Sequence, residues 1–107
     1  MSLKYIINNG EIIMGNVEFH RELHGSHKDK SKTIGGGKLY WDKEVKKVYF
    51  YGVSLDFGAV TKDQFIEAWG ISLIPPSIKE CEIYFTNGKL TDGEENLILE
   101  GKLQVNV

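Results

Sequence analysis

The sequence has one cysteine, two prolines and no long apolar run among its 107 residues. A single cysteine, Cys81, excludes an internal disulfide and a cysteine-based zinc framework, and this usage fits a reducing compartment. No apolar segment approaches the roughly 18 residues of a membrane span, and the first residues lack the apolar core of a signal peptide. We therefore expect a soluble, cytoplasmic protein with no membrane partner.

Neither sign of charge is in large excess, because the net charge is −2. Eight of the thirteen basic residues nevertheless lie between Arg21 and Lys47, whereas nine of the fifteen acidic residues follow Lys47. This asymmetry predicts a positive central surface that suits an anionic ligand. The acidic total argues against nucleic acid as a partner.

Alternating apolar and polar residues predict the strands of one domain over residues 1–107. Strands at residues 4–7 and 11–14 flank Asn-Asn-Gly, which suits the positive φ angles of a tight hairpin turn. Residues 38–51 are rich in aromatic and β-branched side chains around a charged turn, and they form a second expected hairpin that begins directly after three glycines. A further strand is expected at residues 82–85.

Two short helices are expected as well. The first covers residues 17–24 with Asn16 as its cap, and the second follows a capping box at residues 61–64 and ends at Gly70. Two consecutive prolines argue against regular structure at residues 75–76. Hairpins combined with two short helices predict an α+β fold with a mixed β-sheet.

All three histidines lie in the stretch FHRELHGSH, at positions 20, 24 and 27. On one continuous helix they would share a face and could bind zinc. Glutamate does not follow the first histidine as in H-E-x-x-H, and Gly25 should end the helix, so we expect no metal site. His24 and His27 are interpreted as exposed polar residues, whereas the position of His20 in the first helical turn permits a structural or a chemical role.

The stretch GGGKLYWDKEVKKVYFYGVSLDFGAV, residues 35–60, resembles the janus/ocnus family of phosphohistidine phosphatases. The shared features are three glycines, a basic residue and a strand that ends in Tyr-Gly-x-Ser. LKYII and VEFH, nearer the N-terminus, follow in the order of the family. The likeness covers residues 4–88, and residues 89–107 form an extension for which we expect a hairpin.

The resemblance implies a phosphohistidine-phosphatase-like fold and an activity on the phosphoramidate of a protein histidine. The partner would be a phosphorylated peptide or a small phosphorylated ligand, and no cofactor is implied. His20 would be the catalytic base or nucleophile, and Lys4 would act as an electrostatic clamp. Phosphate would be bound through Arg21, Lys38, Ser54, Leu55 and Asp56, largely by the backbone N–H groups at positions 20, 21 and 56.

Two departures from the family keep other functions open. Asp56 stands where the family has a small neutral residue, and residues 12–15 lack the arginine of the family. Two like charges about 4 Å apart cost about 4 kcal/mol even at an effective dielectric constant of about 20. The alternatives are a non-catalytic binding module for a phosphorylated peptide or nucleotide-like ligand, and a protein-interaction module that uses the C-terminal hairpin as an exposed edge.

Overall fold

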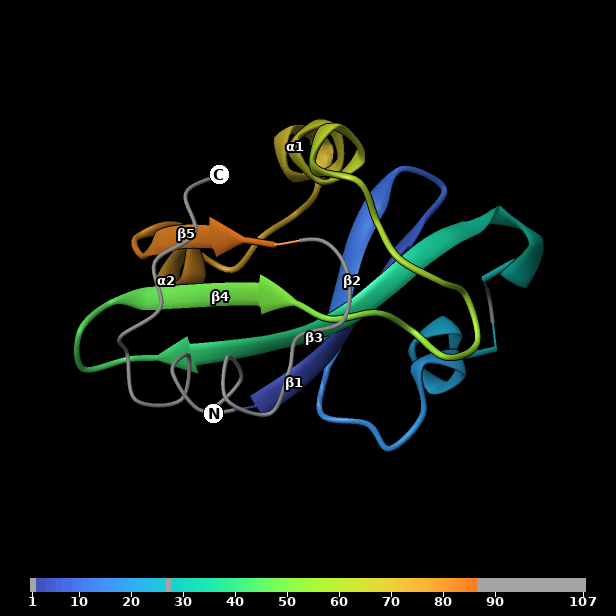
Figure 1. Cartoon of the computed structure of the whole chain (residues 1–107), viewed down its shortest axis with the longest axis horizontal. Helices are drawn as coiled ribbons and strands as arrows, with labels where there is room; N and C mark the ends of the chain where they lie inside the picture. The colour runs from blue at the N-terminus through green and yellow to red at the C-terminus, as the bar shows by residue number, and fades with distance from the viewer. Residues whose placement is uncertain (1, 27, 87–107) are drawn as a thin grey trace.

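The computed structural model, which describes residues 2–26 and 28–86, is built on a five-stranded sheet (Figure 1). The strand order is β2-β1-β3-β4-β5, in which β5 runs parallel to β4 and the other neighbours are antiparallel. The predicted α+β class with a mixed sheet is confirmed, although of the two predicted helices only the one that follows the capping box is an α-helix. The elements are β1 (Ser2–Asn8), β2 (Glu11–Gly15), β3 (Thr33–Asp42), β4 (Lys47–Tyr51), β5 (Glu82–Phe85), α1 (Lys62–Ile71), α2 (Pro76–Lys79) and the 3₁₀ helices η1 (His20–His24) and η2 (Lys30–Lys32).

Neither α1 nor α2 has the length and apolar composition needed to span a membrane, and the same holds for every helix in the described residues. The hairpin expected over residues 89–107 lies outside the part of the chain that the structure describes.

The β1–β2 hairpin is closed by the turn that the sequence predicts. Asn8 pairs with Glu11, and the two residues between them, Asn9 and Gly10, have φ angles of 51° and 79°. Two positive φ angles are typical of a type I′ turn, whose twist matches that of the strands it joins. The turn therefore sets the register of the whole hairpin.

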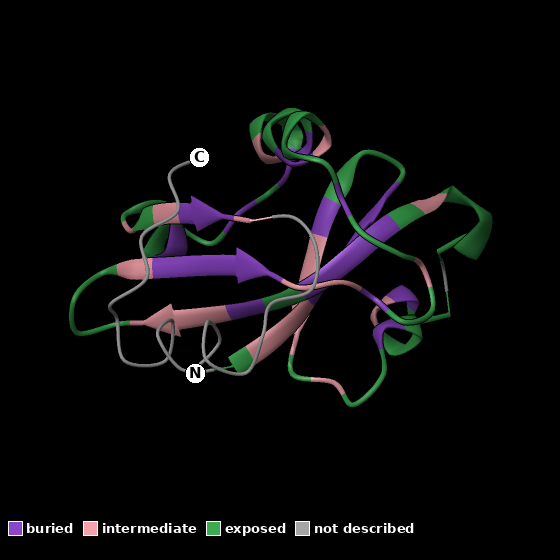
Figure 2. Cartoon of the chain, viewed as in Figure 1, coloured by how far each residue is buried: buried purple, intermediate pink, exposed green. Residues whose placement is uncertain are grey.

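The hydrophobic core lies between one face of the sheet and helix α1, and Figure 2 shows the buried residues along the central strands. Phe65 of α1 is fully buried, stacks on Phe85 with ring centroids 4.5 Å apart and packs on Phe50 at 4.7 Å. Burial of one such ring contributes about 1.5–3 kcal/mol to stability. Helix α2 adds Ile78 to the same core.

The other face of the sheet carries Lys4 and a cluster of tyrosines. Side chains alternate along a strand, so Lys4 lies on the opposite face from Tyr5, whose ring belongs to the core. On β4 and β5, Tyr49, Tyr51 and Tyr84 form a second buried cluster, in which the rings of Tyr49 and Tyr84 stack with centroids 5.1 Å apart. The predicted site and the core thus use opposite faces.

The first predicted helix is shorter than expected and is capped differently. The helix over residues 17–24 with Asn16 as its cap is wrong, because the chain forms only the 3₁₀ helix η1, which has no side-chain cap. Gly25 ends it, as predicted, at a φ of 60°. The Lys4 ammonium group donates to the carbonyl of Glu18, so a tertiary contact holds the chain before η1 and overrides local helix propensity.

Helix α1 begins as its capping box predicts. The Thr61 hydroxyl accepts from the N–H of Gln64 at 3.1 Å, and the Gln64 side chain accepts from the N–H of Thr61 at 3.0 Å. The helix continues one residue beyond Gly70, to Ile71. The expected break at the two prolines is wrong, because Pro76 is the first residue of α2, where a missing N–H costs no helical hydrogen bond.

The three glycines lie inside β3 rather than before it. A Cβ atom at Gly36 would lie 2.3 Å from the carbonyl oxygen of Tyr5, and one at Gly37 would lie 2.5 Å from that of Tyr51. Both contacts are with backbone atoms, which no side-chain rotation relieves. Only glycine therefore allows the neighbouring segments to approach this part of β3.

The variant Gly36→Ala should lower the free energy of unfolding by about 3 kcal/mol, because its methyl group would push β1 away from β3. The matched control is Gly70→Ala in α1, where a Cβ meets no atom within 4 Å and alanine should stabilise the helix by about 0.5–1 kcal/mol. Chemical denaturation of both variants measures the difference. Equal stabilities would contradict the close backbone approach.

Candidate functional site

His20, the first residue of η1, is held against strand β3. Its side chain is only 7% exposed, and Nε2 lies 2.7 Å from the carbonyl oxygen of Gly37. Because a carbonyl oxygen only accepts hydrogen bonds, Nε2 carries the proton in the neutral ring. Nδ1 therefore keeps its lone pair and is the ring atom that can act as a base or a nucleophile.

Three charged side chains lie within electrostatic range of this ring. Burial lowers the pKa of His20 below its ordinary value of 6.5 and outweighs the Gly37 hydrogen bond, which raises that pKa. Lys4 and Lys38, which face each other across the β1–β3 ladder, lower the pKa further, whereas Asp56 raises it. The structure thus brings four of the residues predicted for the site together.

The segment after β4 closes into a tight turn over residues 54–58, which we call the serine turn. The carbonyl of Ser54 accepts from the N–H of Gly58 at 2.8 Å. The turn is fixed to β3 at Gly36, whose carbonyl accepts from the N–H of Ser54 at 3.0 Å and whose N–H donates to the carbonyl of Gly58 at 3.0 Å. Gly36 therefore holds the serine turn directly beside the residue that binds His20.

The serine turn offers fewer N–H groups to a ligand than the resemblance implies. The hydroxyl of buried Ser54 accepts from the N–H of Asp56 at 3.2 Å and from that of Phe57 at 3.1 Å, so both donors are engaged. Leu55 is 96% exposed at the tip, and its N–H makes no hydrogen bond to any described residue. In this conformation Leu55, rather than Asp56, has an N–H without a partner among the described residues.

Arg21 and Asp56 form an ion pair beside His20. The guanidinium Nη1 of Arg21 lies 3.8 Å from Oδ2 of Asp56, and the guanidinium also sits over the ring of Phe19, 4.3 Å from its centroid. Asp56, which stands where the janus/ocnus family has a small neutral residue, therefore pairs with Arg21 in the structure. The two residues are far apart in the chain, and no local pattern could have predicted this pair.

The prediction that His24 is an exposed residue at a helix end is wrong. Its side chain is 2% exposed, and Nδ1 lies 2.9 Å from the carbonyl oxygen of Arg21. Nε2 lies 2.6 Å from the hydroxyl of Thr33, which also accepts from the side-chain amide of Asn8 at 2.9 Å. The ring contacts Phe57 edge-on, with centroids 5.0 Å apart. Sequence spacing alone gives no sign of this burial.

The histidines do not converge on a metal ion among the described residues. His20 uses one ring nitrogen on a carbonyl, and His24 uses both of its nitrogens on protein partners. Within residues 2–26 and 28–86, no group of three histidine, cysteine, aspartate or glutamate side chains could bind a metal ion. His27 lies outside the described residues.

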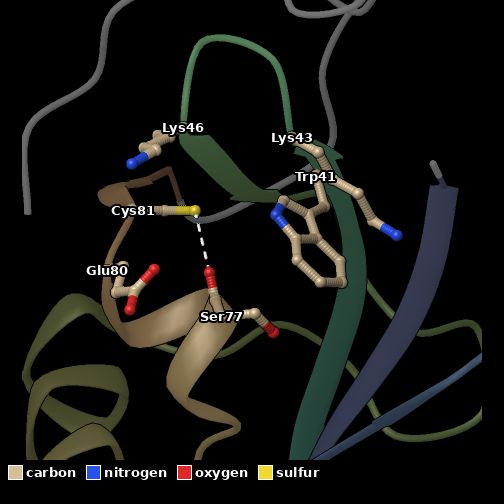
Figure 3. A pocket seen from close by; sticks show the side chains of 6 residues that line it. All are labelled: Trp41, Lys43, Lys46, Ser77, Glu80 and Cys81. Carbon is tan, nitrogen blue, oxygen red and sulfur yellow. Dashed lines mark hydrogen bonds between the residues drawn. The ribbon is translucent and has the colours of Figure 1, made fainter.

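A separate hollow of about 320 Å³ lies between the β3–β4 turn and helix α2 (Figure 3). The thiol of Cys81 donates to the carbonyl of Ser77 across 3.3 Å, and the Lys43 ammonium group lies 4.6 Å from the centroid of the Trp41 ring. None of the predicted site residues lines this hollow. Its lining residues are Trp41, Lys43, Lys46, Ser77, Glu80 and Cys81.

Comparisons with protein-family models, with curated proteins and with solved structures give no match for this chain. The likeness to the janus/ocnus family therefore rests on the sequence features described above. Chemically, the site combines a buried imidazole, basic side chains from two strands and an ion pair. Such a combination suits an anion whose charge changes during a reaction.

The imidazole of His20 should titrate below pH 6.5 in the folded protein, because burial disfavours the charged ring. As the pH falls, His20 of the unfolded chain is protonated near pH 6.5, whereas His20 of the folded protein is protonated only at a lower pH. Between these two pKa values the free energy of unfolding therefore decreases as the pH falls. An NMR titration of the ring protons, assigned with the variant His20→Gln, measures the midpoint. The same variant should weaken the loss of stability on acidification. A titration midpoint at or above pH 6.5 would contradict the expected effect of burial on the pKa of His20.

Proposed function

We propose that this protein binds a phosphoryl group at His20 and hydrolyses the phosphoramidate bond of a phosphohistidine in a peptide. The observation that carries the proposal is a buried imidazole fixed by the Gly37 carbonyl, with Lys4 and Lys38 within electrostatic range. The order of the triple glycine and Tyr-Gly-x-Ser in the sequence supports the same reaction.

The reaction begins at Nδ1 of His20, which bears the lone pair. In one route Nδ1 attacks phosphorus, the P–N bond of the substrate breaks and its imidazole takes a proton from water; a second water molecule then displaces phosphate from phosphorylated His20 and restores the ring. In the other route Nδ1 takes a proton from the water molecule that attacks phosphorus, the P–N bond breaks, and this proton passes to the departing imidazole. Lys4 and Lys38 stabilise the negative charge that spreads over the phosphoryl oxygens in the transition state. A lowered pKa keeps His20 neutral at pH 7, as both routes require.

A non-catalytic binding module is the second candidate, and one feature of the serine turn favours it. The N–H groups of Asp56 and Phe57 are already donated to Ser54, and the Asp56 carboxylate lies near the ring. Catalysis requires hydrogen-bond donors that stabilise the transition state more strongly than the bound substrate. A site with few free N–H groups can bind an anion but provides little of that additional stabilisation. Binding of a phosphorylated peptide without turnover is the behaviour expected of this candidate.

The variant His20→Gln should reduce phosphate release from a phosphohistidine peptide by about 100-fold, because a base or nucleophile is removed. Lys4→Met should reduce release less and should weaken the binding of inorganic phosphate, measured by ³¹P NMR. The matched control is Lys79→Met, which removes the same charge from the exposed end of α2, away from η1 (Figure 1). Release at background level from the unmodified protein would reject catalysis. Phosphate binding unaffected by Lys4→Met would reject the site itself.

The variant Asp56→Asn should tighten binding of inorganic phosphate by about tenfold. The substitution removes a negative charge that repels the phosphate anion, and it releases the Arg21 guanidinium from its ion pair. Asp63→Asn, on an exposed position of α1, makes the same change of charge elsewhere and should leave the affinity unchanged. Calorimetric titration with inorganic phosphate compares the three proteins. Weaker binding after Asp56→Asn would show that the carboxylate contributes to the ligand contact instead of opposing it.

A further inference from the structure

A chain of hydrogen bonds through buried His24 runs beside the candidate site. Nδ1 of His24 faces the carbonyl oxygen of Arg21, so Nδ1 carries the proton and donates. Nε2 is then the acceptor for the hydroxyl hydrogen of Thr33. The hydroxyl oxygen in turn accepts from the amide of Asn8. Every member has a defined donor or acceptor role, which fixes one tautomer of the His24 ring.

This chain joins all the segments that build the site. Asn8 ends β1, Thr33 begins β3 and Arg21 lies in η1, next to the reacting histidine. The His24 ring also contacts Phe57 of the serine turn. The side chain is therefore in contact with η1, with β3 and with the serine turn at once, whereas its own nitrogens are fully engaged by the protein.

We propose that His24 is a positioning residue, which holds the backbone of η1 so that the His20 ring stays on the Gly37 carbonyl. The inference rests on the proposed function, because it assigns His24 to the same phosphoryl site. His24 itself is buried, and its two nitrogens bind Arg21 and Thr33, so it does not react with the ligand. Its effect on the reaction passes through the placement of His20.

The contact that matters most is the bond from Nδ1 to the Arg21 carbonyl, because it acts on the backbone one residue after His20. Asparagine places its amide where Nδ1 lies, whereas glutamine reaches the position of Nε2. Phenylalanine keeps the ring contact with Phe57 but provides neither hydrogen bond. Asparagine therefore tests the contact with the Arg21 backbone, glutamine tests the contact with Thr33, and phenylalanine tests packing alone.

The experiment compares His24→Asn, His24→Gln and His24→Phe in the full chain. The readouts are the tautomer of the His20 ring from its ¹⁵N chemical shifts without ligand, the affinity for inorganic phosphate from ³¹P NMR, and kcat and KM on a phosphohistidine peptide. We expect His24→Phe and His24→Gln to lose the single Nε2–H tautomer of His20 and to lower phosphate affinity and kcat by about tenfold. His24→Asn should retain most of all three.

The proposal is overturned if folded His24→Phe keeps the wild-type tautomer of His20 and the wild-type phosphate affinity, or if His24→Asn is impaired as strongly as His24→Phe. If His24→Phe does not fold, His24→Gln, which loses the Arg21 contact and keeps the Thr33 contact, takes its place; an unchanged His20 tautomer in folded His24→Gln then rejects the proposal. The tautomer of His20 without ligand tests the positioning role of His24 separately from the proposed phosphatase function. Even if His20→Gln leaves phosphate binding intact and the proposed function fails, that readout still decides whether His24 positions the ring.

Discussion

The fold and the site both depend on a stretch of β3 that has no side chains. At Gly35, Gly36 and Gly37 a Cβ atom would lie 2.3–2.6 Å from backbone oxygens of neighbouring segments. Because these positions are bare, β1 pairs closely with β3, the serine turn bonds to Gly36, and His20 bonds to the Gly37 carbonyl. One short piece of backbone therefore fixes the position of every segment that contributes to the site.

The sequence predicts best those elements whose signals are local. The Asn-Gly turn, the capping box at Thr61 and the alternation along the strands each act within a few residues, and the structure has the hairpin, α1 and the mixed sheet. The extent of η1 was predicted less well. A lysine from β1 bonds to the carbonyl of Glu18, and such a long-range contact leaves no periodic pattern in the sequence.

The candidate site shows the same division between local and long-range causes. The proximity of His20, Lys4 and Lys38 was expected from the family resemblance, and their charges lie within range of one another. The Arg21–Asp56 pair and the burial of His24 could not be predicted, because each requires two segments to meet in three dimensions. A histidine with both nitrogens engaged looks no different in sequence from an exposed one.

The Arg21–Asp56 pair shows how a carboxylate is compatible with the proposed anion site. Asp56 lies 3.8 Å from the Arg21 guanidinium, so a neighbouring positive charge offsets part of its negative charge before any ligand binds. In the proposed function, the charges of Lys4 and Lys38, which act on the His20 ring, would attract the phosphoryl group, which carries close to two negative charges near pH 7. The Asp56 carboxylate would oppose that attraction and would therefore favour release of the anionic product.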